Sequence, residues 1–164
     1  MIPDRRRVLS NLFDRLYGGS IIRNDLRGEL VEEIVGLALA PNWKLCGSDW
    51  GSCDLQHAQS GLRIQVKQSA ARQSWFTDNK GSSPARFSIA VKTGRYEGAD
   101  WIPGAGRNAD IFIFAWHGTT GADCDHADPA QWEFFVVSEV ALPARNPLAC
   151  SRSSAWPKLS IFPV

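Results

Sequence analysis

The stretch from Cys53 to Ser69 constrains the fold of this chain most strongly, because its pattern predicts two short strands joined by a tight turn. Asp54 lies on the first strand, and Gln65 and Lys67 lie on the second. Alternate side chains of a strand leave the same face, so Gln65 and Lys67 share one face and the apolar residues beside them turn to the other. A carboxylate, an amide and an ammonium group therefore meet on one side of a packed hairpin. This arrangement predicts a chemical site.

The length and charge of the chain fit one domain spanning residues 1–164, long enough to bury a core without disulfide or metal staples. Its 18 Lys and Arg nearly balance its 17 Asp and Glu, which excludes a generally basic coat for nucleic acid but permits a local basic groove. No apolar run is long enough to span a membrane, and no hydrophobic signal-peptide core is present. We therefore expect a cytoplasmic protein whose four cysteines are free thiols.

The elements around the hairpin follow from hydrophobic periodicity and from turn residues. Helices are predicted from about Pro3 to Tyr17 and from an N-cap at Asn24 to just before Pro41. Glycine-rich loops are predicted at Gly81–Pro84 and Gly104–Gly106, and a short helical turn at Ser138–Val140. The predicted strands are Trp43–Cys46, Cys53–His57, Leu62–Ser69, Phe87–Val91, Asp110–Trp116, Trp132–Val137 and Lys158–Phe162. The pattern is that of an α/β domain.

Metal-assisted cleavage of a phosphodiester needs hard oxygen ligands and a group beside the attacking water. The candidate ligands are the Asp54 carboxylate, the Val66 backbone carbonyl and the Gln65 side-chain carbonyl. Lys67 would then position the water and stabilise charge on the phosphate. Glu32 is the first choice to complete the shell, because it borders the apolar stripe of the second helix. The alternates on the same helix are Glu29 and Glu33.

A helical Glu, then Asp54, and after an eleven-residue step Gln65-Val66-Lys67, resemble the PD-(D/E)xK nuclease superfamily. The Arg27-Gly28-x-x-x-Glu32 spacing is similar to the first core helix of that superfamily. The resemblance implies a restriction-endonuclease-like α-β-β-β-α-β core, with a central mixed sheet flanked by helices. It also implies a DNA endonuclease of the restriction or repair type that uses Mg²⁺ or Mn²⁺. Gln65 stands where the superfamily has an acid, which removes one negative charge from the expected metal site.

Basic and amide residues follow the motif closely and are candidates for contacts with DNA phosphates. They are Gln68, Arg72, Gln73 and Lys80, with Trp75 among them as a surface for base stacking. The alternative for this segment is an ordinary polar loop with Trp75 packed against the core. Many cuts of both DNA strands need two active sites, so a homodimer is also expected.

Several other residues have alternative interpretations. His57 should point away from the face of Asp54 and is interpreted as a surface or packed histidine. Cys124 and His126 could contribute to a zinc site, but their spacing carries no zinc signature. The polar loop with His117, Asp123, Asp125 and His126 either binds a cation or is simply solvated. For the whole chain, the alternatives to an active nuclease are a nuclease-fold protein that binds without cutting and an interaction domain with no nucleic-acid role.

Overall fold

The computed structural model describes residues 2, 4–46, 52–77, 81–97, 99–143, 150–151 and 158–159, with the backbone alone at 97, 150–151 and 158–159. Within these ranges, no helix has the length and hydrophobicity of a membrane span. The organisation of residues 1–164 as a single domain stays a prediction.

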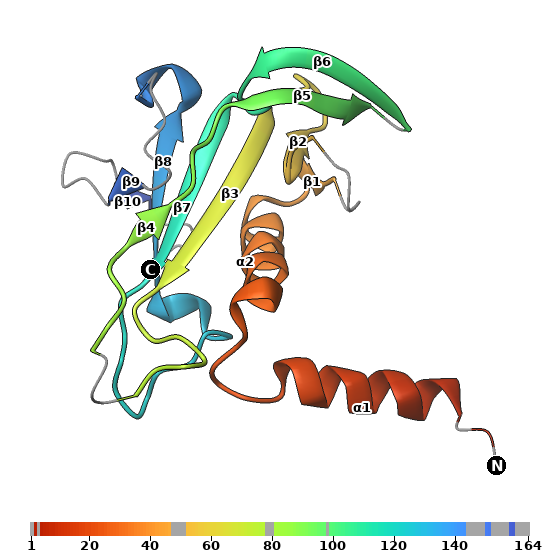
Figure 1. Ribbon diagram of the computed structural model, residues 1–164. Helices are drawn as coiled ribbons and strands as arrows, with labels where there is room; N and C mark the ends of the chain where they lie inside the picture. The colour runs from red at the N-terminus through yellow and green to blue at the C-terminus, as the bar shows by residue number, and fades with distance from the viewer. Residues whose placement is uncertain are drawn as a thin grey trace.

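A six-stranded mixed sheet forms the centre of the molecule, in the order β1-β2-β3-β7-β8-β10 (Figure 1). β3 and β7 run parallel over seven paired residues, and every other neighbouring pair is antiparallel. The strands are β1 (Trp43–Leu45), β2 (Leu55–His57), β3 (Arg63–Ala70), β7 (Ile111–His117), β8 (Trp132–Ser138) and β10 (Lys158–Leu159). The arrangement confirms the predicted α/β class with a central mixed sheet. Positions 160–162 of the last predicted strand lie outside the described residues.

The two faces of the sheet belong to two separate cores. On one face, helix α2 (Asn24–Leu39) packs Val31, Ile34 and Val35 against the sheet, including Ile64 and Val66 of β3. The core of the opposite face consists of Phe87, Ile89, Ala109, Phe112, Phe114, Phe135, Val137 and Leu142. Because side chains alternate along β3, Gln65 and Lys67 are directed away from the face that α2 covers.

The crossover from β3 to β7 holds strands where the resemblance implied a helix. Its described residues form turns, then β4 (Arg86–Phe87), β5 (Lys92–Glu97) and β6 (Asp100–Gly106). β4 pairs with β9 (Cys150–Ser151), whereas β5 and β6 pair with each other in a hairpin that crosses the end of the sheet where β3 and β7 begin (Figure 1). Two short 3-10 helices, η1 (Pro129–Gln131) and η2 (Glu139–Ala141), flank β8. η2 matches the helical turn predicted at Ser138–Val140.

The prediction of a loop at Gly104–Gly106 is wrong, because these residues end strand β6. Their composition is typical of a loop, but pairing with β5 extends as far as Lys92 opposite Gly106. A Cβ atom at Gly94 would overlap the indole of Trp101, so the absence of a side chain there lets the two strands pair closely. The glycines of this hairpin therefore serve strand pairing.

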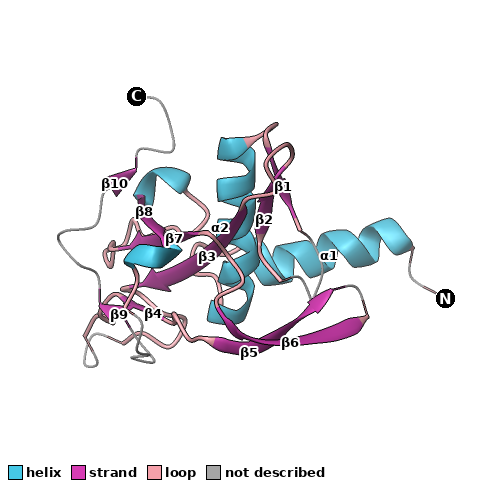
Figure 2. Ribbon diagram, turned by 90° about the horizontal axis from the view of Figure 1, so that it is seen from above, coloured by secondary structure: helices cyan, strands magenta, loops and turns pink. Residues whose placement is uncertain are grey.

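Helix α1 (Arg5–Tyr17) extends away from the rest of the molecule (Figures 1 and 2). Asp4 caps it by accepting a hydrogen bond from the Arg7 backbone N–H at 3.2 Å. None of the α1 residues is buried, and its apolar side chains at Val8, Leu9, Leu12 and Phe13 are exposed. The predicted helix is thus present, but within the described residues its apolar face is not covered.

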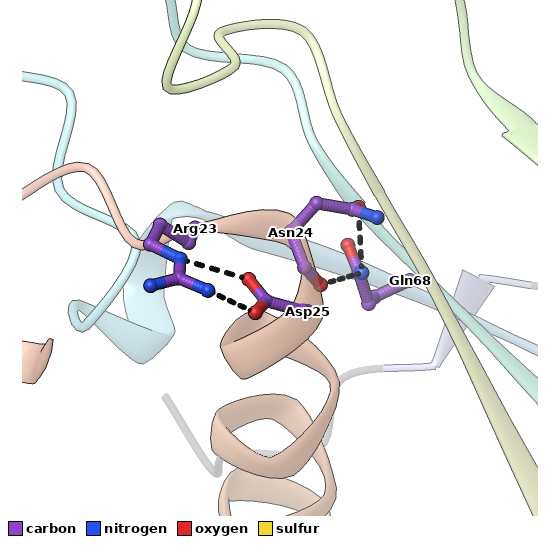
Figure 3. A network of polar contacts seen from close by, with 4 residues as sticks. All are labelled: Arg23, Asn24, Asp25 and Gln68. Carbon is purple, nitrogen blue, oxygen red and sulfur yellow. Dashed lines mark hydrogen bonds and ion pairs between the residues drawn. The ribbon is translucent and has the colours of Figure 1, made fainter.

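The N-cap prediction at Asn24 is wrong by one residue, because Arg23 is the N-cap of α2 and Asn24 already lies in the helix. Its side-chain oxygen accepts hydrogen bonds from Arg27 Nη2 at 2.8 Å and Gln68 Nε2 at 3.2 Å. Figure 3 shows the contact with Gln68 beside the exposed ion pair of Arg23 and Asp25. The asparagine therefore joins the start of the helix to β3 instead of capping the helix.

Candidate active site

Asp54 lies where the antiparallel pairing of β2 and β3 ends. Its backbone N–H donates to the Ile64 carbonyl at 2.9 Å, continuing the ladder that begins with Leu55 opposite Ile64. Its side chain turns towards β3, where Oδ2 accepts hydrogen bonds from the Val66 backbone N–H at 2.6 Å and from Gln65 Nε2 at 2.5 Å. The Asp54 carboxylate thus accepts the Val66 N–H, which a backbone carbonyl of β2 would accept if the pairing of the two strands continued.

This geometry places three of the predicted oxygen groups together. In a strand, the N–H and C=O of one residue point to the same edge, so the Val66 carbonyl lies on the edge that Asp54 occupies. Gln65 directs its amide nitrogen at Asp54, so its role here is to donate to the carboxylate. For the Gln65 oxygen to bind a metal at this position, the side-chain amide would have to rotate by about 180°, which exchanges the positions of its oxygen and nitrogen.

The charges at Asp54 and Lys67 act on each other across this site. Burial raises the pKa of Asp54, against the opposing effects of Lys67, of the two hydrogen bonds and of Lys92. Burial also lowers the pKa of Lys67, which the charges of Asp54 and Glu32 oppose and that of Lys92 reinforces. The predicted carboxylate and ammonium groups are therefore electrostatic partners in a partly buried site.

Glu32 is the acid of helix α2 whose pKa is changed by the charges of Asp54 and Lys67. Burial, followed by the charges of Asp54 and Glu29, raises the pKa of Glu32 to about 7, while Lys67 lowers it. Glu33 and Glu29 instead line a cavity with Phe13 and Tyr17, where α1 meets α2. The structure thus brings Glu32 into electrostatic contact with the Asp54–Lys67 pair.

Lys92 is a residue of this site that sequence reasoning missed. It lies exposed at the start of β5, and its charge acts on the pKa of both Asp54 and Lys67. No periodicity or motif in the sequence links Lys92 to the β2–β3 hairpin that carries Asp54 and Lys67. The β5–β6 hairpin comes close to these residues only in the folded chain. A second basic group therefore lies near the predicted catalytic lysine.

Three of the residues predicted to contact DNA have internal partners. Gln68 Oε1 accepts from Arg27 Nε at 2.7 Å, and Gln73 Oε1 accepts from Arg27 Nη2 at 3.0 Å. Arg72 donates to the Gly121 carbonyl at 2.6 Å. Lys80 lies outside the described residues. DNA contact by these four side chains stays a prediction, and the two glutamines have a definite role as acceptors inside the protein.

Trp75 is 58% exposed, so the alternative in which it packs against the core is wrong. The turn after β3 presents the indole to solvent, and Phe76 lies under the Arg72 guanidinium at 5.6 Å from its ring centre. An exposed aromatic side chain is available on this surface.

Arg27 is the largest fully buried side chain in the described residues, and nothing in the sequence analysis gave it a role. Three amide oxygens surround its guanidinium, from Asn24, Gln68 and Gln73. Burial lowers the pKa of Arg27 to about 10, because these acceptors satisfy its donors without supplying a negative charge. Gln68 and Gln73, which the sequence pattern predicts as DNA contacts, are the two glutamines that accept hydrogen bonds from this arginine.

His117, Cys124 and His126 form a buried group whose residue types and proximity permit metal binding, with ligand atoms within 4.8 Å of one another. Both ring nitrogens of His126 have hydrogen-bond partners: Nδ1 accepts from the Ile22 N–H at 3.0 Å, and Nε2 lies 3.1 Å from the Arg72 carbonyl. His117 Nε2 is similarly 3.1 Å from the Asp125 carbonyl.

Burial and the nearby charge of Arg27 favour the neutral form of both histidines in this group. Burial, then the charges of Arg27 and His117, lower the pKa of His126 to about 4. Burial and the charge of Arg27 also lower the pKa of His117. Asp123, which the sequence placed with these residues, is not part of the group. A metal ion there would have to replace existing hydrogen bonds next to a buried guanidinium.

The remaining histidine and the cysteines were also considered in the sequence. His57 packs edge-on against Trp43 and accepts from the Ser60 N–H at 3.1 Å. Cys46, Cys53 and Cys124 are free thiols as expected, with the first two sulfur atoms 3.1 Å apart. The side chain of Cys150 lies outside the described residues. None of these groups completes the Asp54 site.

No protein-family model matches this sequence, and neither does any curated protein. A solved structure that is similar to this chain is that of a bacterial homing endonuclease, I-Ssp6803I. The two share 16% identity with a TM-score of 0.39, and the match covers 80% of each chain. At this level of similarity, the match assigns neither a family nor an activity to this chain.

Proposed function

We propose that this chain is a divalent-metal-dependent DNA endonuclease of the restriction or repair type, with a PD-(D/E)xK-like site in which Gln65 replaces an acid. The observation that carries the proposal is the convergence of Asp54, Glu32 and Lys67, whose charges act on one another in a partly buried site. Burying two acids near each other is unfavourable unless a cation compensates them.

The donor set suits a hard cation such as Mg²⁺ or Mn²⁺. Asp54 and Glu32 offer carboxylate oxygens, Val66 a backbone carbonyl, and Gln65 an amide oxygen after its side chain turns over. A divalent ion held by these groups would supply Lewis-acid stabilisation of the phosphate and would acidify a water molecule.

The side chains of the chain itself would do the remaining work. The Lys67 ammonium would donate to a phosphate oxygen and neutralise charge that develops in the transition state. Glu32, whose pKa responds to the charges of Asp54 and Lys67, would complete the ligand shell or hold a metal-bound water. Hydrolysis would break one P–O bond and add the elements of water, and Lys92 would attract the DNA backbone to the site.

Cleavage of supercoiled plasmid in Mg²⁺ or Mn²⁺ tests the proposal. Asp54→Ala and Lys67→Ala should each abolish nicking, whereas Asp100→Ala and Lys44→Ala, which change an exposed acid and an exposed lysine, should retain it. Nicking that survives both site substitutions would overturn the assignment.

A protein that binds DNA or a protein partner without cutting is the second candidate function, and the bond from Gln65 to Asp54 favours it. This bond satisfies Asp54 without any cation. Absence of divalent-ion binding at millimolar concentration, together with DNA binding that weakens steeply with salt, would favour this candidate. Salt-independent or absent DNA binding would favour an interaction domain.

We also propose that the expected homodimer forms through α1. Isolated helices of this length are marginally stable in water, so the exposed apolar face of α1 calls for a partner. A second copy of α1 would cover this face. Sedimentation should show a dimer that Leu12→Glu dissociates and that Leu37→Glu, at an exposed position of α2, leaves intact. A monomeric wild type would contradict this proposal.

A further inference from the structure

A polar cavity of about 450 Å³ lies where β3 and β7 begin, next to β5. Three arginines line it, Arg63 at the start of β3, Arg95 on β5 and Arg107 before β7, together with Asn108. Asp110 is the one acid among the lining residues. Arginines from three different segments therefore line one cavity.

The Nδ2 group of Asn108 is shielded from solvent and has no hydrogen-bond partner in the described part of the chain. Such a donor costs roughly 1–3 kcal/mol when it stays unpaired. Asn108 also lines the cavity, so a bound acceptor that reached this amide would remove the cost. The amide thus points to a ligand that accepts hydrogen bonds.

The walls of the cavity are held in place before any ligand arrives. Arg107 donates to the Ile89 carbonyl at 2.9 Å, to the Glu139 carboxylate at 3.0 Å and to the Pro143 carbonyl at 2.6 Å. The Asp110 carboxylate accepts from the Arg63 backbone N–H at 2.8 Å, which occupies one of its oxygens. A preorganised cavity lined by basic residues favours an anion with several acceptor oxygens, the chemistry of phosphate.

The cavity is on the same side of the sheet as the candidate active site. Arg63, Gln65 and Lys67 are alternate residues of β3, so their side chains leave the same face, and Arg63 precedes Lys67 by about 13 Å at the usual rise of a strand. That separation spans only a few nucleotides of one DNA strand. The cavity therefore lies within reach of a strand whose phosphodiester sits at Lys67.

We propose that this cavity binds a phosphate of the DNA strand a few nucleotides from the phosphodiester that is cleaved. The proposal rests on the proposed nuclease function. It assigns Arg63, Arg95 and Asn108 to binding and positioning of the substrate, with no part in the chemical step.

The experiment measures binding of a fluorescent DNA duplex in Ca²⁺ over a series of salt concentrations, and cleavage in Mg²⁺ separately. Arg63→Met and Arg95→Met should each weaken binding roughly fivefold to tenfold near ~0.1 M salt and reduce the salt slope by about one. Arg86→Met, at an exposed arginine of β4, serves as the matched control and should change neither quantity.

Asn108→Asp keeps the experiment decisive if the arginine variants fold poorly. The new carboxylate would repel a bound phosphate, so DNA binding should weaken, and a thermal melt of the variant alone shows whether it folds. A parallel thermal-melting series with inorganic phosphate separates the two sources of the anion. Stabilisation by phosphate that Asn108→Asp removes, without any change in DNA binding, would mean that the cavity serves a free phosphate and would overturn the DNA assignment.

The outcomes distinguish this proposal from the nuclease proposal. Weakened binding in the cavity variants without any cleavage by the wild type would support the phosphate site and reject the nuclease function. Unchanged binding and salt slope in all three cavity variants, with cleavage that still depends on Asp54, would overturn the phosphate site alone. Absence of DNA binding by the wild type would overturn both.

Discussion

Gln65 donates a hydrogen bond from Nε2 to Oδ2 of Asp54 at 2.5 Å. Gln65 stands where the PD-(D/E)xK pattern has an acid, and its amide fixes the position of the Asp54 carboxylate. A glutamate in its place would set one carboxylate against another at this distance. The amide therefore permits the pair to form without a cation, and it lowers the negative charge available to bind one. This single contact separates the two candidate functions.

Replacing Gln65 with Glu should make the site depend on metal. Without a divalent ion, repulsion from Asp54 should lower the free energy of unfolding by roughly 1–3 kcal/mol at neutral pH. With Mn²⁺, the added carboxylate should maintain or raise the affinity of the site. Chemical denaturation and titration calorimetry measure the two effects, and Gln56→Glu, at an exposed position of β2, is the control. A clear loss of Mn²⁺ affinity in Gln65→Glu would count against a metal site.

Glu32→Gln should change how stability depends on pH. The pKa of Glu32 is raised in the folded protein from 4.5 to about 7, so the folded state holds a proton that the unfolded state releases. The stability linked to this proton is fully present below pH 4.5 and is lost as pH rises through 7. The variant should therefore gain stability over the wild type above pH 7, by about 1 kcal/mol after solvent screening.

Urea unfolding of both proteins across this pH range measures the difference. A stability difference that does not vary with pH would contradict the raised pKa.

Lys67→Met should raise the pKa of Glu32 further, because Lys67 is the group that lowers it. The variant loses the ammonium that faces Asp54 and Glu32 and leaves two acids without that partner. Heteronuclear NMR titration of the Glu32 carboxyl carbon would follow the shift. Lys44→Met, on exposed β1, should leave the titration unchanged. An unchanged midpoint in Lys67→Met would mean that the lysine does not act on Glu32.

Arg27→Met should destabilise the fold by about 3 kcal/mol, since the buried guanidinium is lost and the amide oxygens of Asn24, Gln68 and Gln73 lose their donor. It should also raise the pKa of His126, because the charge of Arg27 lowers it. Arg23→Met, which breaks only an exposed ion pair, should leave stability nearly unchanged. Equal effects of the two substitutions would contradict a structural role for the buried guanidinium.

Local patterns were sufficient to predict the elements that carry the candidate site. The alternation around Gln65 and Lys67 predicted their shared face, and the periodicity of the second helix pointed to Glu32. Both signals are short in range, because a strand repeats every two residues and a helix about every four. Asn24 was misplaced by one residue, since its tertiary contact with Gln68 prevailed over the usual capping preference.

Long-range groupings could not be derived in the same way. Lys92 reaches the site on a hairpin whose glycines are typical of loops, and Asn108 reaches the arginine-lined cavity through the crossover that contains that hairpin. Arg27 has its glutamine partners more than 40 residues away. The spacing of residues along a chain does not predict such tertiary contacts until the order of strands in the sheet is known.

A crystal structure of the protein soaked in Mn²⁺ tests the central claim most directly. The claim predicts anomalous density at the β3 edge, between the Asp54 carboxylate and the Val66 carbonyl, with ligand distances of about 2.0–2.3 Å. It also predicts that this density disappears in Asp54→Ala. Absence of metal at this edge, or density only among His117, Cys124 and His126, would contradict the claim.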